Sequence, residues 1–174
     1  MSVQNEPGSA GGGVAQLIET WREVPAFMVD RHLNVTAANS LVRRLFPGCD
    51  PGVNVVRYAF ENRLPWFSEA QLAELKGMTA AALRDSLDRS SPDQGFIELV
   101  GDMAVEYDDF AASWAEEGTA DVGGMVVLND PTVGTLRLTW QMLDIPETDG
   151  HRLCVWGTAD GESADALARI VSGP

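Results

Sequence analysis

Hydrophobic residues recur at helical spacing at the start of the chain and then change to the spacing of β-strands. The helical stretch carries Leu17, Ile18, Trp21 and Val24 on one face. Pro25 disfavours helical geometry for the residue before it, so this helix should end there. Residues 26–29 and 35–38 are short apolar and β-branched runs, and the polar turn 30–34 separates them. The pattern predicts a β-hairpin.

Helix-start signals mark the middle of the chain. Asn39 follows the second strand and is suited to cap a helix, because its side-chain oxygen can accept a free backbone N–H of the first turn. Ser68 and Gln71 have the spacing of a capping box, which predicts the start of a long helix. A second capping signal at Ser91, with Pro92 at the first helical position, predicts another helix.

The last third of the chain returns to β periodicity. Strands are predicted over residues 125–128, 134–143 and 151–158, with Asn-Asp-Pro and Glu-Thr-Asp-Gly turns between them. Alternate residues from Leu136 to Trp140 are apolar and should face one way. Ser163 should cap a final helix. The order ββ–helices–βββ predicts an α+β, PAS-like fold, in which helices pack on one face of an antiparallel sheet.

The domain organisation follows from length and from the first residues. At 174 residues the chain fits one domain with a substantial core, which we place at residues 14–171. Residues 1–13 are rich in Gly and Ser and lack an apolar period, which predicts a flexible tail or linker. Two interpretations of this stretch stay open: a tether to another domain, or an ordinary frayed terminus.

Charge narrows the functional classes. The chain has 12 Lys+Arg and 26 Asp+Glu, a formal net charge of −14. A surface that binds DNA phosphates needs clustered basic residues, and no such run occurs, so we expect no direct nucleic-acid binding. The same charge disfavours anionic membrane surfaces, and no apolar run reaches the ~18 residues that span a bilayer. Because no signal peptide opens the chain, the expected compartment is the cytoplasm.

Signals for catalysis and for metal binding are weak. His32 and His151 both fall in turns, and neither has metal-ligand spacing. The sequence has no nucleophile elbow or phosphate loop, and its acidic clusters lack the alternating carboxylates of an EF-hand. Cys49 and Cys154 have no CxxC spacing, which indicates two free thiols. We therefore expect no enzyme activity, no metal and no cofactor.

An ordered set of short motifs runs through almost the whole chain. They are Trp21, Pro25-Ala26, Asp30-Arg31, Ala38-Asn39, Asn54 to Arg57 with Phe60, Trp66, Leu83-Arg84, Phe110 with Trp114-Ala115, Pro131 to Gly134, Leu143 with Pro146, and Ala166-Leu167. In this order they resemble the MmyB-like transcription-regulator ligand-binding domain. The resemblance implies a bacterial sensor with a PAS-like sheet and an apolar pocket for a fatty acid or small signalling lipid. In that family the domain follows an XRE-type helix-turn-helix, which we do not find in this chain.

The resemblance also implies a set of ligand-binding residues, because the matching segments wall the pocket of similar domains. Large aromatics on segments that face the interior are the main members, although a plain core role is the general alternative. The candidates are Phe27, Phe46, Arg57, Phe60, Trp66, Leu83, Arg84, Phe110, Trp114, Leu138, Trp140 and Trp156.

Departures from the family pattern bear on the polar end of the ligand. Where similar domains carry basic residues or His, this chain has Ala111, Ala112, Glu117 and Asp130. A ligand carboxylate near Glu117 would be repelled rather than paired. Arg57 and Arg84 match the family and remain the candidates for a headgroup contact, with surface ion pairing as the alternative.

Two functions from different classes stay open. The first is the ligand-sensing domain of a bacterial transcription regulator, which reaches DNA only through a missing or separate helix-turn-helix domain. The alternative is a protein-interaction or dimerisation module with a solid core and no small ligand. A homodimer is compatible with either function. The chain is expected to be either a fragment of a longer regulator or a stand-alone paralogue.

Overall fold

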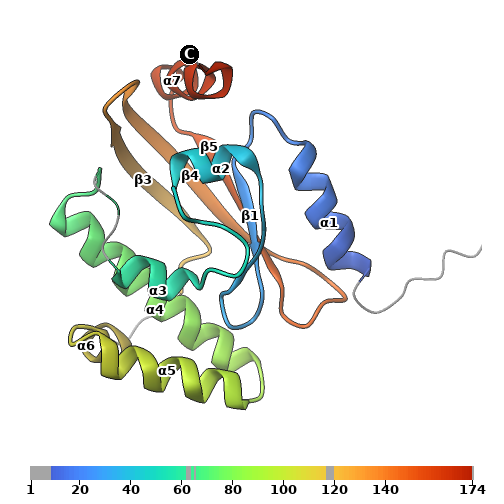
Figure 1. The fold of residues 1–174 in the computed structure, drawn as a ribbon, viewed down its shortest axis with the longest axis vertical. Helices are drawn as coiled ribbons and strands as arrows, with labels where there is room; N and C mark the ends of the chain where they lie inside the picture. Colours follow the sequence, from blue (N-terminus) through green and yellow to red (C-terminus); the bar gives the residue numbers. More distant parts are fainter. Residues whose placement is uncertain (1–8, 62–63, 65, 117–119, 174) are drawn as a thin grey trace, which may run out of the picture.

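The computed structural model describes residues 9–61, 64, 66–116 and 120–173. In this part of the chain one antiparallel sheet has the strand order β2–β1–β5–β4–β3 (Figure 1). The strands are β1 Ala26–Val29, β2 Val35–Ala38, β3 Gly123–Asp130, β4 Gly134–Asp144 and β5 Arg152–Thr158. The bounds of β1 and β2 are those predicted, and β1 pairs with β5, which joins the hairpin to the three-strand meander. The predicted α+β, PAS-like fold class is confirmed.

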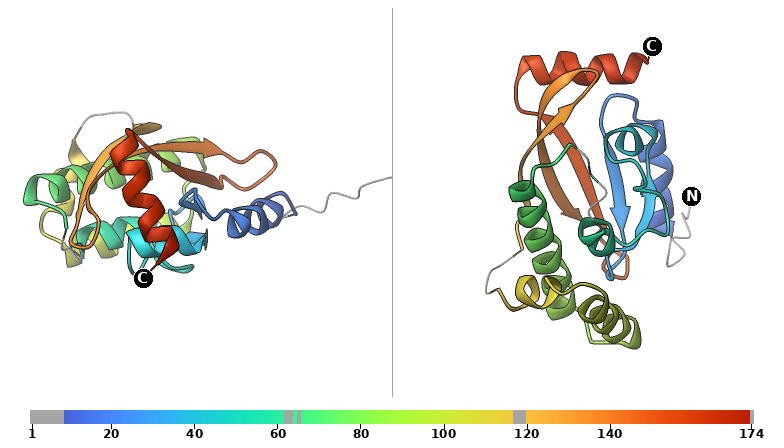
Figure 2. Two further views of the ribbon diagram at one scale, coloured as in Figure 1. Left: turned by 90° about the horizontal axis from the view of Figure 1, so that it is seen from above. Right: turned by 60° about the vertical axis from the view of Figure 1, so that its left-hand side comes forward.

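Helices connect the two parts of the sheet and flank it. They are α1 Ser9–Thr20, α2 Ser40–Leu45, α3 Val55–Phe60, α4 Glu69–Arg89, α5 Gln94–Glu106, α6 Phe110–Ala115 and α7 Gly161–Ser172. The two views of Figure 2 show α4 and α1 on opposite sides of the sheet, with α7 lying across one end. The long helix α4 contacts both α3 and α6, so these helices form one layer.

Alternation along β1 explains why helices lie on both sides. Phe27 and Val29 face a large core that they share with α2–α6, whereas Met28 faces a smaller core with Ile18 of α1. The predicted alternation in β4 is also observed, since Leu136 and its inward neighbours are buried while the residues between them are exposed. The helical layer expected on one face is therefore present, and α1 adds a helix on the other.

The first helix occupies part of the stretch that was predicted to be a flexible tail. It begins at Ser9, so it includes residues 9–13 of that stretch, and it ends at Thr20, before the predicted end at Val24. A Cβ atom on Gly11 would lie 3.7 Å from Thr148 Cγ2, so this first turn packs close to another segment. Such packing offsets the low helix propensity of glycine, and the sequence carries no sign of it because this stretch lacks an apolar period. Residues 1–8 lie outside the described residues.

Two of the predicted helix starts are corrected. The N-cap of α5 is Asp93 rather than Ser91, because the Asp93 side chain accepts the Phe96 backbone N–H. The N-cap of α7 is Asp160 rather than Ser163. Ser163 is fully buried, and its Oγ accepts the Arg137 backbone N–H at 2.8 Å, so it joins α7 to β4 instead.

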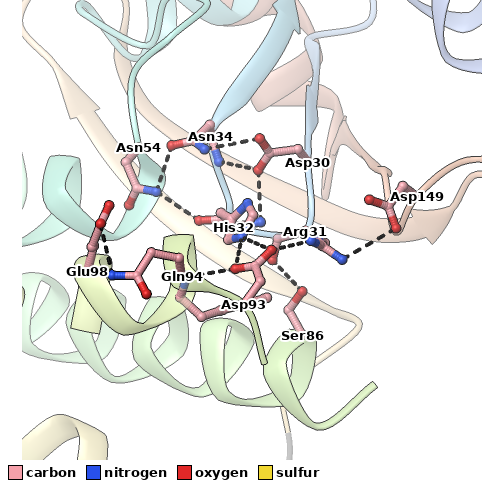
Figure 3. A network of polar contacts seen from close by, with 11 residues as sticks. Asp30, Arg31, His32, Asn34, Asn54, Ser86, Asp93, Gln94, Glu98 and Asp149 are labelled. Carbon is pink, nitrogen blue, oxygen red and sulfur yellow. Dashed lines mark hydrogen bonds and ion pairs between the residues drawn. The ribbon is translucent and has the colours of Figure 1, made fainter. Parts of the chain in front are cut away.

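The β1–β2 turn is held by a network of polar side chains (Figure 3). Asp30 Oδ1 accepts the backbone N–H groups of His32 and Asn34 at 2.8 and 2.9 Å, which confirms the predicted turn chemistry. The next two turn residues reach across to α5, where Asp93 contacts both His32 and Arg31. The network thus fixes the hairpin against the N-terminus of α5.

Candidate ligand-binding site

Two small apolar cavities lie in the large core, between the inner face of the sheet and helices α3 and α4. Their volumes are about 100 Å³ and about 70 Å³. Five side chains line both cavities and form a partition between them: Phe27, Val55, Leu75, Val126 and Trp156. The two cavities are therefore neighbours, and movement of the partition would join them.

The two cavities differ in polarity. The larger one, here called the Arg152 cavity, is also lined by Val29, Leu33, Met78, Thr79, Ala82, Asp121, Trp140, Met142, Arg152 and Cys154. The smaller one, here called the Phe46 cavity, is also lined by Val35, Phe46, Cys49, Val53, Tyr58, Ala59, Leu64 and Phe67. Ionisable side chains with formal charge thus occur in the wall of the Arg152 cavity and not in that of the Phe46 cavity.

Alternate residues of β5 line one side of both cavities. Arg152, Cys154 and Trp156 are two residues apart, so they point to the same face of the sheet. The residues between them, Leu153 and Val155, pack toward α1 on the opposite face. Trp156 reaches both cavities, whereas Arg152 reaches only the larger one, so β5 runs along the direction that joins them.

Arg152 is a buried cation with few partners. Its residue is 7% exposed. Within the described residues its guanidinium donates one hydrogen bond, to Ala82 O at 3.4 Å, and forms one ion pair, with Asp85 Oδ2 at 3.5 Å. Burial lowers the pKa of Arg152, and the Asp85 carboxylate opposes that shift. Asp85 Oδ2 is itself buried; it lies 3.1 Å from Arg89 Nε but accepts no well-aligned hydrogen bond from the described residues.

The partition holds a second polar atom that is poorly satisfied. The buried Nε1 of Trp156 has no well-aligned hydrogen bond among the described residues, although it interacts with the Cys154 thiol. The thiols nearby are free and buried. Burial raises the pKa of Cys49 to about 11, and burial together with Cys49 also raises the pKa of Cys154. Both thiols are therefore protonated near neutral pH and act as apolar wall.

The structure brings four of the sequence-predicted residues to the cavities: Phe27, Phe46, Trp140 and Trp156. The other eight lie outside the walls of these two cavities: Arg57, Phe60, Trp66, Leu83, Arg84, Phe110, Trp114 and Leu138. Among these, Phe110 packs with Phe60 at 5.4 Å and with Trp114 at 5.7 Å between ring centroids. This aromatic cluster joins α3 to α6, which is the core role that sequence reasoning kept as its alternative.

The two arginines proposed as headgroup contacts are engaged elsewhere. Arg57 forms ion pairs with Asp102, at 2.9 Å, and with Glu106 of α5. Arg84 donates to the Trp114 backbone carbonyl, and its guanidinium carbon lies 6.0 Å from the centroid of that ring. For Arg57 these contacts match the ion-pairing alternative. For both residues they describe attachment of one helix to another.

Three of the positions at which the sequence departs from the family pattern, Ala111, Ala112 and Asp130, lie outside the cavity walls. Ala111 and Ala112 are exposed on α6. Asp130 ends β3, and its Oδ1 accepts the Thr132 and Val133 backbone N–H groups, at 2.7 and 3.0 Å, in the β3–β4 turn. Glu117 lies outside the described residues. Loss of positive charge at Ala111, Ala112 and Asp130 therefore changes the surface rather than the cavity walls.

Sequence reasoning missed most of the aliphatic wall and Arg152, the buried cation found in that wall among the described residues. Leu75, Met78 and Met142 line the Arg152 cavity, but an apolar residue at core spacing carries no signal that separates a cavity wall from filled core. Arg152 did carry a signal. It lies two and four residues before Cys154 and Trp156 on a predicted strand, so strand alternation places a charge on the inner face.

Two kinds of site find no support in the described part of the chain. No three His, Cys, Asp or Glu side chains there come together in a way that could hold a metal ion. Within the same residues no helix combines the length and hydrophobicity that crossing a bilayer requires.

Comparison with known proteins identifies the family of the chain. Residues 11–170 match the family model of the MmyB-like transcription regulator ligand binding domain. A search of curated proteins finds no match to the chain. The family match runs from α1 into α7 and so includes every strand of the sheet and both cavities. The chain belongs to the family of MmyB-like transcription regulator ligand binding domains.

Proposed function

We propose that the chain is the sensing domain of a bacterial transcription regulator and binds a fatty acid or similar apolar molecule between the sheet and α4. The observation that carries the proposal is the pair of apolar cavities that share a partition of five side chains, Leu75 and Trp156 among them. Family membership supports a small-molecule ligand. In this proposal the protein acts in the cytoplasm without catalysis, and a separate helix-turn-helix domain contacts DNA.

The expected affinity follows from the apolar surface that an acyl chain buries. Burying ten methylenes gains roughly 8 kcal/mol, at ~0.8 kcal/mol for each CH₂. Lost translational and rotational freedom removes several kcal/mol of that gain. Micromolar affinity is therefore expected for a medium-length acyl chain. Binding has to displace the partition, because each cavity by itself is smaller than the roughly 300 Å³ at the lower end of ligand pockets.

That small volume also favours the second candidate function. A core with voids of about 100 and 70 Å³ is nearly filled, as expected of a domain that works by contacting another protein. In this alternative the same fold serves as an interaction or dimerisation module, and no small ligand enters it.

Ligand binding separates the two functions. Native mass spectrometry of the purified chain would detect a co-purified lipid, and titration with dodecanoic acid would be followed by tryptophan fluorescence. Leu75→Phe places a larger side chain at the partition and should weaken binding at least tenfold. Leu72→Phe is the matched control, since Leu72 is partly buried on the same helix but lines neither cavity.

The expected result is saturable binding to the wild type and to Leu72→Phe. If no lipid co-purifies and acyl chains of different lengths change neither fluorescence nor melting temperature, the core is solid. The interaction-module function then replaces the sensing function.

A further inference from the structure

Donor groups in the Arg152 cavity are concentrated along β5. A guanidinium presents five N–H donors, and within the described residues that of Arg152 donates one hydrogen bond of 3.4 Å. Four residues further on, Trp156 Nε1 is a buried donor with no well-aligned hydrogen bond among the described residues, although it interacts with the Cys154 thiol. Buried donors are ordinarily satisfied, so the guanidinium of Arg152, with one long hydrogen bond and one long ion pair, has donors left for a further acceptor.

We propose that Arg152 binds the acidic head of the ligand and that the apolar tail runs along β5 past Cys154 and Trp156 into the Phe46 cavity. This inference rests on the proposed function and specifies which end of the ligand lies where. The preferred ligand is an unbranched carboxylic acid, because a planar guanidinium matches a carboxylate in bidentate geometry.

The length of the path fits such a ligand. Residues in a strand advance about 3.3 Å each, so Arg152 and Trp156 are about 13 Å apart along β5. The wall beyond Trp156 is formed by apolar groups such as Phe46, Leu64 and Phe67. A polar head at that end would lose its hydration without gaining a charged partner, which sets the direction of the molecule.

The charges around Arg152 allow a ligand carboxylate to replace Asp85 as its partner. The ion pair between Arg152 and Asp85 is long, at 3.5 Å, and Asp85 has a closer cation in Arg89, at 3.1 Å. When the ligand carboxylate pairs with Arg152, Asp85 therefore keeps Arg89 as a partner on its own helix. Arg89 also pairs with Asp144, at 3.3 Å. Asp121 also lines this cavity but is exposed, so water and salt screen its negative charge.

The test compares an acid with its ester. Dodecanoic acid and methyl dodecanoate have the same tail, and only the acid carries a negative head. Affinities for both are measured by tryptophan fluorescence and native mass spectrometry on the wild type and on Arg152→Gln. The double variant Asp85→Asn/Arg152→Gln removes both members of the ion pair, so it leaves no buried unpaired charge if the single variant folds poorly.

Arg137→Gln is the matched control. Arg137 lies on β4 but faces the outer side of the sheet, where it pairs with Asp160 at 3.3 Å. The wild type and Arg137→Gln should bind the acid about tenfold to a hundredfold more tightly than the ester, as expected for a charge-assisted hydrogen bond in a buried site. Arg152→Gln and the double variant should bind both molecules with similar affinity.

Other outcomes overturn the inference in distinguishable ways. If both molecules bind the wild type equally, or if the Arg152 variants keep the preference for the acid, the head does not lie at Arg152, while the proposed function stands. The same holds if Arg57→Gln abolishes the preference instead. If neither molecule binds the folded wild type, the proposed function fails and this inference fails with it.

Discussion

His32 Nε2 lies 2.9 Å from Asp93 Oδ1, which joins the β1–β2 turn to the first turn of α5 (Figure 3). The same carboxylate accepts the Phe96 backbone N–H at 3.0 Å and forms an ion pair with Arg31. One side chain therefore caps a helix and holds the hairpin against it. The hydrogen bond with His32, followed by that from the Phe96 N–H, lowers the pKa of Asp93 to about 2.

The first prediction concerns acid stability. The folded-state pKa of Asp93 is below its ordinary value of 3.8, so Asp93 adds stability above that pH and loses it as the pH falls toward about 2. Asp93→Asn should lower the free energy of unfolding at pH 7 and flatten its dependence on pH between about 4 and 2. Urea unfolding at several pH values measures both effects. An unchanged slope in the variant would assign the acid sensitivity to other carboxylates.

The second prediction uses two glycines of α5. Gly101 has open space around it, so Gly101→Ala should stabilise the protein by about 0.5–1 kcal/mol through helix propensity. A Cβ on Gly95 would lie 2.9 Å from His32 Nε2, so Gly95→Ala must push the imidazole away from Asp93. That variant should lose about 1 kcal/mol instead. Thermal melting compares the two, and equal stabilisation by both would mean that the His32 contact contributes nothing.

The third prediction concerns Asn39, whose predicted role as the cap of α2 is confirmed. Its Oδ1 accepts the Val42 N–H at 3.1 Å and the Ala26 N–H at 3.3 Å, and its Nδ2 donates to Val24 O at 2.7 Å. The residue is 1% exposed, so Asn39→Ala leaves several buried backbone groups without partners. We expect a loss of about 2–3 kcal/mol, more than for a cap alone.

Ser68→Ala is the control for Asn39→Ala. Ser68 closes the confirmed capping box of α4 with Gln71, but both hydrogen bonds are exposed to water. This variant should lose about 1 kcal/mol or less. If chemical denaturation shows equal losses for the two variants, the contacts of Asn39 beyond its own helix do not stabilise the fold.

The fourth prediction is that the chain does not bind duplex DNA. It follows from the net charge of −14 and from the pairing of Arg57, Arg31 and Arg89 with carboxylates. Fluorescence anisotropy with labelled duplex at low salt should show no saturable binding. Binding that weakens as salt is added would contradict the prediction.

Local sequence signals determined much of the fold. The hairpin bounds, the Asn39 cap and the capping box at Ser68 all depend on residues within a few positions of one another. Backbone preferences act over the same short range, so one sequence is enough to predict them. Asp93 shows the limit of that reasoning. Ser91 and Asp93 are both good caps, and the choice between them goes to the residue that also pairs with His32, 61 positions away.

The candidate site shows the same division. Four of the predicted aromatic residues line the cavities, on strand or helix faces that periodicity predicted to be inward. Phe60, Phe110 and Trp114 are also large aromatic residues at core spacing, but they pack against one another between helices. The sequence cannot separate these cases, because a void depends on how distant segments fit together and not on the hydrophobicity of either one.

Leu33 and Arg152 show what only the tertiary structure decided. Leu33 adopts a positive φ of 64°, which favours glycine or asparagine, yet it is 2% exposed and packs in the large core. Arg152 carries a charge into the same core, beside Asp85. The sequence by itself determined most of the elements, their order and the resemblance to the family, since these depend on local preference, periodicity and the order of short motifs. Long-range packing decided where a strained turn is tolerated and where a cation faces a cavity, because both depend on energies supplied by residues far apart in the chain.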